Sequence, residues 1–431
     1  MSVLGIVAEY NPLHTGHAYH ISHSVEEVGA DAAVCVLSSQ FVQRGEPAIV
    51  NKQARTRMAL MNGIDLVIEL PAAFSCASAE YFASAAVKLL DSLGVVDILS
   101  FGSEEGSLIP LNKAADLLAF ETPAFKISLK DSLDKGFSYP VARQAALKSC
   151  LDGDTYRAVS SPNNILGIEY LKALKRLGSS IQPETIRRAG QGYNDETLDK
   201  TFSSATAIRN HIRSVLAKSS SDENRLRADM TFNIPSELIY MLLPNMPEPS
   251  FKILESELRA GRGPVFFENF EGILFHRLRT ATDQELTALP FMEEGLHNRL
   301  RQAALKEPSL EALINYCTTS RYPSSRINRI LCALLLGMTG SFLEELKNNG
   351  YAQYIRVLGF NDKGRGLLAA SRKKASLPIL IKPAAYKKLE NPLARRLFEH
   401  EIRTTDVYCL AYKRPELRRG GSELTTPPII M

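Results

Sequence analysis

The chain has 431 residues, more than one hydrophobic core usually serves, so we expect two or three domains. Hydrophobic residues make up 45% and charged residues 23%, as in ordinary water-soluble proteins, and no apolar run is long enough to predict a membrane-spanning helix. The net charge of +4 is uneven: residues 317–431 carry 20 Lys and Arg against 9 Asp and Glu, a balance of +11, which leaves −7 on the first 316 residues. A basic half of this kind indicates a polyanionic partner, with a merely solvated basic surface as the alternative.

The chain shows no sign of export. Its first residues, MSVLGIVAEYNP, have no basic region and only a short apolar run, unlike a secretion signal. The six cysteines are scattered without a CxxC pair, which argues against a disulfide framework or a thiolate zinc site. We therefore expect a cytoplasmic protein with no membrane partner.

Short apolar runs alternate with helical patterns along the first hundred residues. The runs are typical of strands buried on both faces, and they are Val3–Ala8, Ala32–Leu37, Asp65–Leu70 and Val96–Gly102. The segments between them are predicted helices: His17–Val28, Lys52–Asn62 and Ala79–Leu93. Repeated β-α units with right-handed crossovers predict a doubly wound, Rossmann-like α/β domain with a parallel sheet. Its ligands should bind at the carboxyl ends of these strands.

The rest of the chain is predicted to be mostly helical. Thr185–Tyr193 has the pattern of a strand that runs into a glycine turn, and Ser204–Lys218 begins like a capped helix. The polar, serine-rich stretch that follows predicts a linker at 219–230. These features divide the chain into a nucleotide-binding catalytic domain, residues 1–218, and a mostly helical basic domain, residues 231–431.

A cluster of histidines follows the first predicted strand, in the stretch EYNPLHTGHAYHISH. The histidines are His14, His17, His20 and His23. Steps of three move around a helix of 3.6 residues per turn, so the four do not share a face and we assign no metal site. Ordinary surface histidines are the other alternative. The unit His14-Thr15-Gly16-His17, however, lies at a helix start, where unpaired backbone N–H groups favour an anion. Imidazole groups there can donate to phosphoryl oxygens as negative charge builds, so we predict a nucleotide-phosphate site.

The His-x-Gly-His pattern resembles the signature of the nucleotidyltransferase superfamily that includes class I aminoacyl-tRNA synthetases. A second motif of that superfamily, Ser-x-Thr-x-Ile-Arg at a helix start, is present as SATAIR from Ser204 to Arg209. Its hydroxyls, helix N-terminus and guanidinium would hold the β- and γ-phosphates. Further segments extend the resemblance to the tRNA(Met) cytidine acetate ligase family; they are FVQRGEPAIVNKQAR, GIDLVIELP, FGSEEGSL, SPNNILGIEYLKAL and RYPSSRINRILCALLL.

This resemblance implies a two-step reaction. Acetate is activated with ATP as acetyl-adenylate, with release of pyrophosphate, and the acetyl group then acetylates the wobble cytidine of elongator tRNA(Met) to N4-acetylcytidine. ATP would be a substrate, with Mg²⁺ as a candidate companion, and His14 and His17 the catalytic residues. The implied ATP contacts are Val7, Ala8, Glu9, Tyr10, Asn11, Pro12, Leu13, His14, Thr15, Gly16, His17, Ala18, Tyr19, His20, Gly102, Asn163, Arg188, Ser204 and Arg209. The stretch GQGYND at 190–195 departs from the expected GAGYHD, so Gln191 and Asn194 receive no role.

Other basic residues are candidates for binding anions. Lys52, Arg55 and the turn at 43–45 follow the second predicted strand, where they could hold acetate, phosphate or the RNA, with a solvated basic helix as the alternative. Recognition of the tRNA is assigned to the C-terminal half, with these candidate residues: Arg321, Arg326, Arg329, Lys363 and Arg365.

Two other functions fit parts of the pattern. A small-molecule adenylyltransferase of the same superfamily would need only the two phosphate motifs, but it leaves the basic C-terminal half without a purpose. A non-catalytic RNA-binding protein would tolerate loss of a motif histidine, whereas both are present. The sequence assigns no oligomeric state.

Overall fold

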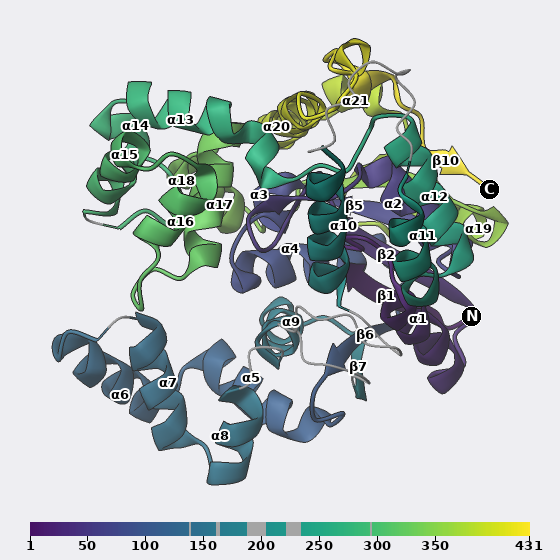
Figure 1. Cartoon of the computed structure of the whole chain (residues 1–431). Coiled ribbons are helices and arrows are strands. Elements are labelled where there is room, and N and C mark those ends of the chain that lie inside the picture. Colours follow the sequence, from purple (N-terminus) through teal and green to yellow (C-terminus); the bar gives the residue numbers. More distant parts are fainter. Residues whose placement is uncertain (138, 161–163, 188–203, 221–233, 294) are drawn as a thin grey trace.

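The computed structural model describes residues 1–137, 139–160, 164–187, 204–220, 234–293 and 295–431. At its centre lies an eight-stranded sheet in the order β10-β8-β5-β2-β1-β6-β7, with β9 also paired to β8 (Figure 1). Its strands are β1 (Val3–Ala8), β2 (Ala32–Ser38), β5 (Leu66–Leu70), β6 (Ile98–Ser103), β7 (Gln182–Arg187), β8 (Ile355–Phe360), β9 (Ile379–Leu380) and β10 (Ile429–Ile430). A small hairpin is formed by β3 (Phe41–Val42) and β4 (Glu46–Pro47).

The predicted α/β fold is confirmed by the strand directions. Strands β5, β2, β1, β6 and β7 are all parallel, so their carboxyl ends meet at one edge of the sheet, hereafter the carboxyl edge. The chain builds outward from β1 to β2 and β5, then returns to the other side of β1 with β6 and β7. The strand order therefore reverses between β1 and β6, and this switch point is where ligands of such sheets bind.

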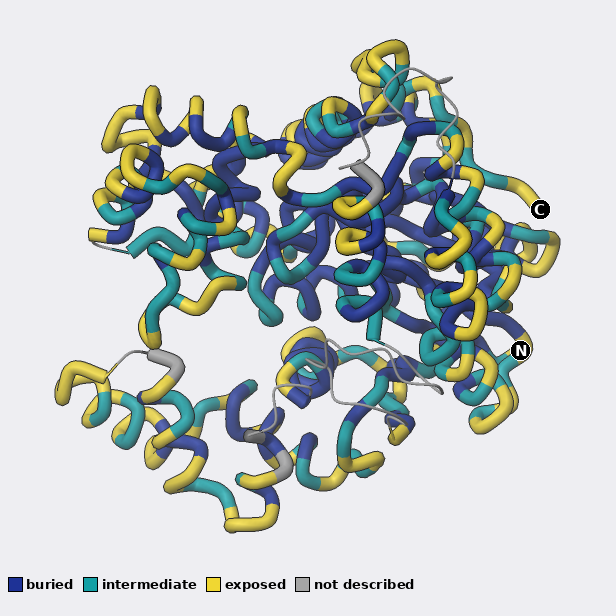
Figure 2. The backbone as a smooth tube through the Cα atoms, viewed as in Figure 1, coloured by how far each residue is buried: buried dark blue, intermediate teal, exposed yellow. Residues whose placement is uncertain are grey.

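The sheet separates two hydrophobic cores, because alternate side chains of a strand point to opposite faces. Val34 and Val36 of β2 pack in one core, whereas Cys35 and Leu37 pack in the other. All seven residues of β2 are buried, and the buried segments trace the sheet through the middle of the molecule in Figure 2. The uninterrupted apolar strands of the sequence therefore reflect helices on both faces.

The helices of the first half follow the predicted order. They are α1 (Thr15–Glu27), α2 (Lys52–Met61), α3 (Ala72–Ser75), α4 (Ala79–Leu93), α5 (Leu108–Phe120), α6 (Pro123–Asp134), α7 (Tyr139–Cys150), α8 (Gly153–Ser160), α9 (Asn164–Leu177) and α10 (Ala205–Ser220). Helices α1, α2 and α10 contribute to one core, and α4, α5 and α9 to the other. Figure 1 shows α5–α8 as a group below the sheet.

The second half is largely helical, as predicted. Its helices are α11 (Ser236–Leu242), α12 (Glu248–Arg259), α13 (Glu271–Thr280), α14 (Asp283–Thr287), α15 (Leu296–Lys306), α16 (Leu310–Cys317), α17 (Ser324–Leu336), α18 (Gly340–Asn348), α19 (Asp362–Lys374), α20 (Pro392–Cys409) and α21 (Ser422–Thr425), with short 3₁₀ turns at Leu243–Asn245, Phe267–Phe270, Pro383–Lys388 and Pro415–Leu417. No single helix among the described residues is long and apolar enough to cross a membrane. Helices α17 and α18 together have the length and apolar composition of such a helix, but their axes meet at a bend of 96°.

Three strands of the sheet come from the second half, which the sequence did not predict. Strand β8 pairs antiparallel with β5, and β9 and β10 pair parallel with β8. Both of the expected domains, residues 1–218 and 231–431, therefore contribute strands to the same sheet. Most of the expected linker at 219–230 lies outside the described residues.

A buried group of charges joins the two halves near the carboxyl edge. Its side chains are at most 2% exposed and comprise Lys52, Glu69, Arg356, Glu401 and Glu423. The Nζ atom of Lys52 lies 2.5 Å from Oε1 of Glu69 and 2.7 Å from Oε2 of Glu423. Burial raises the pKa of Glu69, although Lys52 opposes that rise. Burial likewise raises the pKa of Glu401. The cluster spans α2, β5, β8, α20 and α21, so each half supplies charges that the other must neutralise.

We expect Lys52→Met to lower the free energy of unfolding by about 3–5 kcal/mol, because it leaves buried carboxylates without their cation. Denaturant unfolding followed by circular dichroism measures the change. Lys113→Met, which removes an ion pair with Asp152 at an exposed site, is the control and should leave the midpoint unchanged. Equal midpoints for both variants would contradict this role of Lys52.

Candidate nucleotide-binding site

The predicted histidine motif forms the start of α1 at the carboxyl end of β1. His14 is the residue that caps the helix, and its Nδ1 accepts the N–H of Gly16 at 3.1 Å. His17 reaches back, and its Nδ1 accepts the N–H of His14 at 3.3 Å. The two rings are stacked, with centroids 3.7 Å apart. Two histidines thus take the places of the usual serine and glutamate in a reciprocal capping box.

These hydrogen bonds determine which ring nitrogen carries the proton. A neutral imidazole has one donor and one acceptor nitrogen, and in both residues Nδ1 is the acceptor. The proton of each neutral ring is therefore on Nε2, so Nε2–H is the ring donor that could face a phosphoryl oxygen. The helix start supplies further backbone N–H groups and a partial positive charge. The geometry thus provides a preorganised electrostatic site for an anion.

The loop before the histidines has an unusual backbone. Tyr10 has φ +48°, in the left-handed region that residues other than glycine rarely adopt. Its ring is buried and meets the ring of His17 edge-on, with centroids 5.2 Å apart. The side chain of Asn11 accepts the N–H of Ile49 at 2.7 Å, which attaches the loop to the segment after the β3–β4 hairpin. Backbone of this kind persists where surrounding contacts impose it, and it is common at functional sites.

The remainder of the implied stretch Val7–His20 runs from the end of β1 into α1. Leu13 is fully buried, whereas Tyr19 is exposed with its ring stacked on that of His23. His20 turns toward the neighbouring strand, and its Nε2 lies 3.2 Å from Oγ of Ser100 in β6. His20 therefore links α1 to β6 across the switch point.

The β6 side of the site includes a residue that sequence reasoning missed. Gly102 lies near the end of β6, paired with Ile186 of β7, and its contact with ATP stays a prediction. The loop after β6 is held by Asn164, whose Oδ1 accepts the N–H of Glu104 at 3.1 Å and which is fully buried. The predicted contacts Asn163 and Arg188, and the stretch 190–195, lie outside the described residues.

The second phosphate motif lies beside the first. Ser204 accepts the N–H of Ala207 at 3.1 Å and so caps the start of α10. Arg209 donates from Nη1 to the carbonyl of Asn11 at 2.8 Å and from Nη2 to Oε1 of Glu46 at 2.6 Å. The structure therefore brings the two motifs together. Arg209 is engaged with protein groups, so it orders the loop after β1 in addition to carrying the charge that the motif predicts.

A carboxylate faces this arrangement from the end of β1. Oε1 of Glu9 accepts the N–H of Gln43 at 2.8 Å, which attaches the β3–β4 hairpin to the nucleotide loop. Burial raises the pKa of the Glu9 carboxyl, and nearby Glu46 raises it further, against the opposing hydrogen bond from Gln43. The hairpin in turn packs on α17: a Cβ added to Gly45 would come 2.4 Å from the backbone nitrogen of Arg329.

Lys52 and Arg55 do not face a ligand, which corrects the expectation that one of them could. Both side chains are fully buried, and Lys52 belongs to the charge cluster described above. Arg55 donates instead to carbonyl oxygens after β1 and β2: Nη1 to Glu9 at 2.8 Å and to Ser38 at 2.9 Å, and Nη2 to Ser39. It therefore positions the loops of the carboxyl edge from beneath.

Three of the predicted RNA-binding arginines lie at α17 and are engaged with protein groups. Arg326 donates to the carbonyl of Phe291 at 2.7 Å and pairs with Glu293 at 2.8 Å. Arg321 is exposed and pairs with the same carboxylate at 3.3 Å. Arg329 is mostly buried, which lowers its pKa, and it donates to the carbonyl of Gln43 at 3.3 Å. Of the three, Arg321 presents the most exposed charge.

The other two predicted RNA-binding residues, Lys363 and Arg365, belong to α19. This helix follows β8, which runs antiparallel to β5 and therefore ends at the opposite edge from the histidine motif. Lys363 donates to the carbonyl of Asp31, just before β2 begins, at 3.0 Å. The five arginines and lysines predicted from the sequence thus lie at two separate places.

Among the residues that the structure describes, no group of three or more His, Cys, Asp or Glu is arranged to hold a metal ion. The arrangement at the start of α1 is that of an anion site, with imidazole and backbone N–H donors.

Comparison with known proteins agrees with this geometry. Residues 1–423 match the model of the HIGH Nucleotidyl Transferase family, which defines the class. The chain is 44% identical to the tRNA(Met) cytidine acetate ligase of Acetivibrio thermocellus and 39% identical to that of Clostridium novyi, in each case over the full length of both chains. Two crystal structures of Thermotoga maritima TmcAL align with this chain over the full length of both proteins, at 34% identity. The TM-score is 0.92 for the apo form and 0.89 for the form bound with alpha-thio ATP. The chain belongs to the tRNA(Met) cytidine acetate ligase family, within the HIGH nucleotidyltransferases.

We expect His17→Ala to reduce acetate-dependent exchange of pyrophosphate into ATP by about 100- to 1,000-fold, because it removes one preorganised donor to the developing charge. His14→Asn tests donation separately from capping: asparagine can still cap the helix but lacks Nε2. We expect this variant to keep its melting temperature and to lose exchange.

His23→Ala is the matched control for the histidine variants. His23 lies on the same helix, and its partly exposed ring stacks on the exposed ring of Tyr19 and lies 3.8 Å from Glu27. Its removal should leave exchange unchanged. Full exchange in His17→Ala would overturn the assignment of the motif.

Proposed function

We propose that this protein is an ATP-dependent ligase that acetylates the wobble cytidine of elongator tRNA(Met) to N4-acetylcytidine. In the first step an acetate oxygen attacks the α-phosphorus of ATP, the bond to the bridging oxygen breaks, and pyrophosphate leaves. In the second step N4 of the cytidine attacks the acetyl carbon, AMP leaves as an anion, and the amine loses its proton to solvent. Membership of the family and the nucleotide site at the switch point support this reaction.

The observation that carries the proposal is the pair of histidines capping α1. Acetate and the α-phosphate are both anions, and their approach is opposed by charge repulsion. Two Nε2–H donors and the start of α1 offset this repulsion where the new bond forms. Because the donors are fixed by backbone hydrogen bonds, they need little reorganisation when charge builds.

The second step explains why an activated acetyl group is needed. The amine of cytidine is a weak nucleophile because its lone pair is delocalised into the ring, so acetyl-adenylate with its good leaving group is a suitable donor. The target base must leave its stack to reach the carboxyl edge, as enzymes that act on bases require. Binding of this RNA near α17 is supported by the contact between α17 and the β3–β4 hairpin, because that hairpin also contacts Glu9.

The proposal includes how Mg²⁺ would reach the site and the cell compartment in which the enzyme would work. Since the described side chains offer no cluster for a resident metal, Mg²⁺ would enter on the phosphates of ATP, the mode in which this ion usually reaches nucleotide enzymes. The enzyme would work in the cytoplasm, where ATP, acetate and tRNA are all present.

The decisive experiment is mass spectrometry of tRNA(Met) after incubation with the protein, ATP and isotopically labelled acetate. We expect a labelled acetyl group on the wobble cytidine and one pyrophosphate released for each acetyl group transferred. A tRNA(Met) with uridine at the wobble position is the matched control and should remain unmodified, although acetate-dependent exchange into ATP continues.

Two outcomes would contradict the proposal. Transfer of AMP to a small phosphate ester, with unmodified tRNA, would assign the protein to the small-molecule adenylyltransferases. Binding of tRNA without any turnover of ATP would make it a non-catalytic RNA-binding protein.

A further inference from the structure

Helix α19 begins at the edge of the sheet opposite the nucleotide site, hereafter the amino edge. Asn361 caps the helix with its Oδ1, which accepts the N–H of Gly364 at 3.0 Å, and its Nδ2 donates to Asp65 at 2.8 Å. A Cβ on Gly364 would come 2.0 Å from the carbonyl oxygen of Asp65, so the helix start is pressed against the residue before β5. Lys363 contacts Asp31, before β2, as described above.

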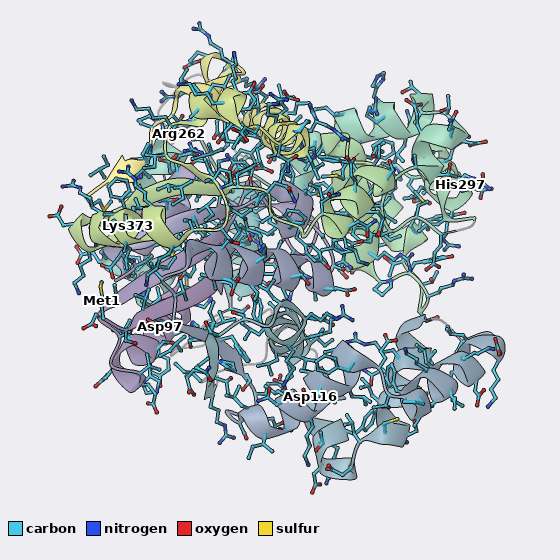
Figure 3. The ribbon with its side chains drawn as sticks, turned by 180° about the vertical axis from the view of Figure 1, so that it is seen from behind. Met1, Asp97, Asp116, Arg262, His297 and Lys373 are labelled. Carbon is cyan, nitrogen blue, oxygen red and sulfur yellow. The ribbon has the colours of Figure 1, made fainter. Side chains whose placement is uncertain are left out.

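The far end of α19 is held at the same edge. The N–H of Ser376, just past the helix, donates to the carbonyl of Ser92 at 3.0 Å, and the Cα of Gly94 lies against Lys374. These residues precede β6, at its amino end. Figure 3 shows Lys373 on the same side of the molecule as Met1 and Asp97, which precede β1 and β6. Helix α19 therefore runs along the amino edge rather than toward the histidine motif.

The outer face of α19 is strongly basic. The helix contains five cations and one carboxylate, and all six side chains are exposed: Lys363, Arg365, Arg372, Lys373, Lys374 and Asp362. Between the two groups of cations the exposed residues are small, namely Gly366, Ala369 and Ala370. Nothing lies within 4 Å of a Cβ added at Gly366, so this middle stretch is open to a close neighbour. We call this surface the α19 face.

Helix stability alone does not account for this charge. The three cations of the last turn complement the negative end of the helix dipole. Lys363 and Arg365 lie in the first turns, where the interaction of a positive charge with the helix dipole destabilises the helix by about 0.3–1 kcal/mol. The ion pair of Arg365 with Asp362, at 3.3 Å, is exposed and therefore weak. With five cations against one carboxylate the face has a net charge of +4 (5 − 1), more than these protein contacts neutralise, and such a charge attracts an anionic partner.

The α19 face suits a sugar-phosphate backbone. Flexible cations at both ends can reach phosphates, and small residues between them let a strand approach the helix closely. The exposed side chains of the face include no aromatic ring or amide, so it offers flexible cations for phosphates rather than a platform on which bases stack. Such a surface contacts a polyanion without reading its sequence.

The distance between the two edges decides which part of the RNA can lie there. Strand β1 has six residues, so the edges are separated by about 20 Å, which is several base-pair steps of an RNA duplex. The reacting base must lie at the carboxyl edge. We infer that the α19 face binds the backbone of the tRNA outside its anticodon loop, as a second contact that the chemistry does not need; this inference rests on the proposed function.

The test compares full-length tRNA(Met) with its isolated anticodon stem-loop. The variant Arg372→Glu/Lys373→Glu should bind full-length tRNA about tenfold more weakly than the wild type, while affinity for the stem-loop stays the same. The slope of log affinity against log salt for full-length tRNA should fall in magnitude by about 1.5, because two phosphate contacts are lost. Melting temperature and acetate-dependent exchange into ATP establish that each variant is folded.

A control variant distinguishes the loss of a local RNA contact from the general effect of a changed net charge. Arg277→Glu/Lys306→Glu makes the same charge change at exposed positions of α13 and α15 and should not discriminate between the two RNAs. The inference would be overturned if the α19 variant lost affinity equally for both RNAs, or lost affinity for neither. A third outcome would assign the face to a membrane instead. In that case the wild type binds anionic lipid vesicles, and the α19 variant loses this binding but still binds full-length tRNA normally. Absence of exchange in the wild type would count against the proposed function, whereas the binding comparison would still decide the α19 face.

Discussion

The position of Lys52, fully buried between Glu69 of β5 and Glu423 of α21, is the constraint on which the rest of the structure depends. A buried ammonium is tolerated only when carboxylates neutralise it, and here they come from segments more than 350 residues apart. The same cluster includes Glu401, which accepts hydrogen bonds from Ser39 and from the N–H of Ala72, at the loops after β2 and β5. The C-terminal helices therefore determine the shape of the carboxyl edge as much as the strands do.

Above this cluster the site is built from backbone groups whose positions are fixed by charged side chains. Arg55 holds the carbonyls after β1 and β2, and Arg209 holds the loop that contains Asn11. With the loops held in this way, the helix start and the two imidazoles can face an anion with their donors already oriented. Preorganisation of this kind is what an enzyme needs when two anions must react.

The sequence predicted the local features of this arrangement well and the long-range ones poorly. Strand β1 and helix α4 have the predicted bounds, because apolar runs and helical periodicity are written in adjacent residues. The place of the histidine motif at the start of a helix was also predicted, since a strand followed by a glycine turn and a helix is a local signal. The reciprocal capping by the two imidazoles was not predicted. Strand β8 was missed because its partner, β5, is about 290 residues away and its surroundings are helical. The burial of Lys52 and Arg55 could not be read locally either, since their partners come from distant loops and helices.

The place of β8 in the sheet has a consequence for how the chain is made. Strand β5 is complete at Leu70, yet the strand that covers its free edge begins at Ile355. At a synthesis rate of about 10 residues per second, the ribosome needs about half a minute to make the intervening chain. During that time the apolar strand β5 has an uncovered edge, and Lys52 has Glu69 but not yet Glu423 beside it. Exposed edges of this kind pair readily with other chains. The nascent protein should therefore be a client of the chaperones that shield emerging hydrophobic segments.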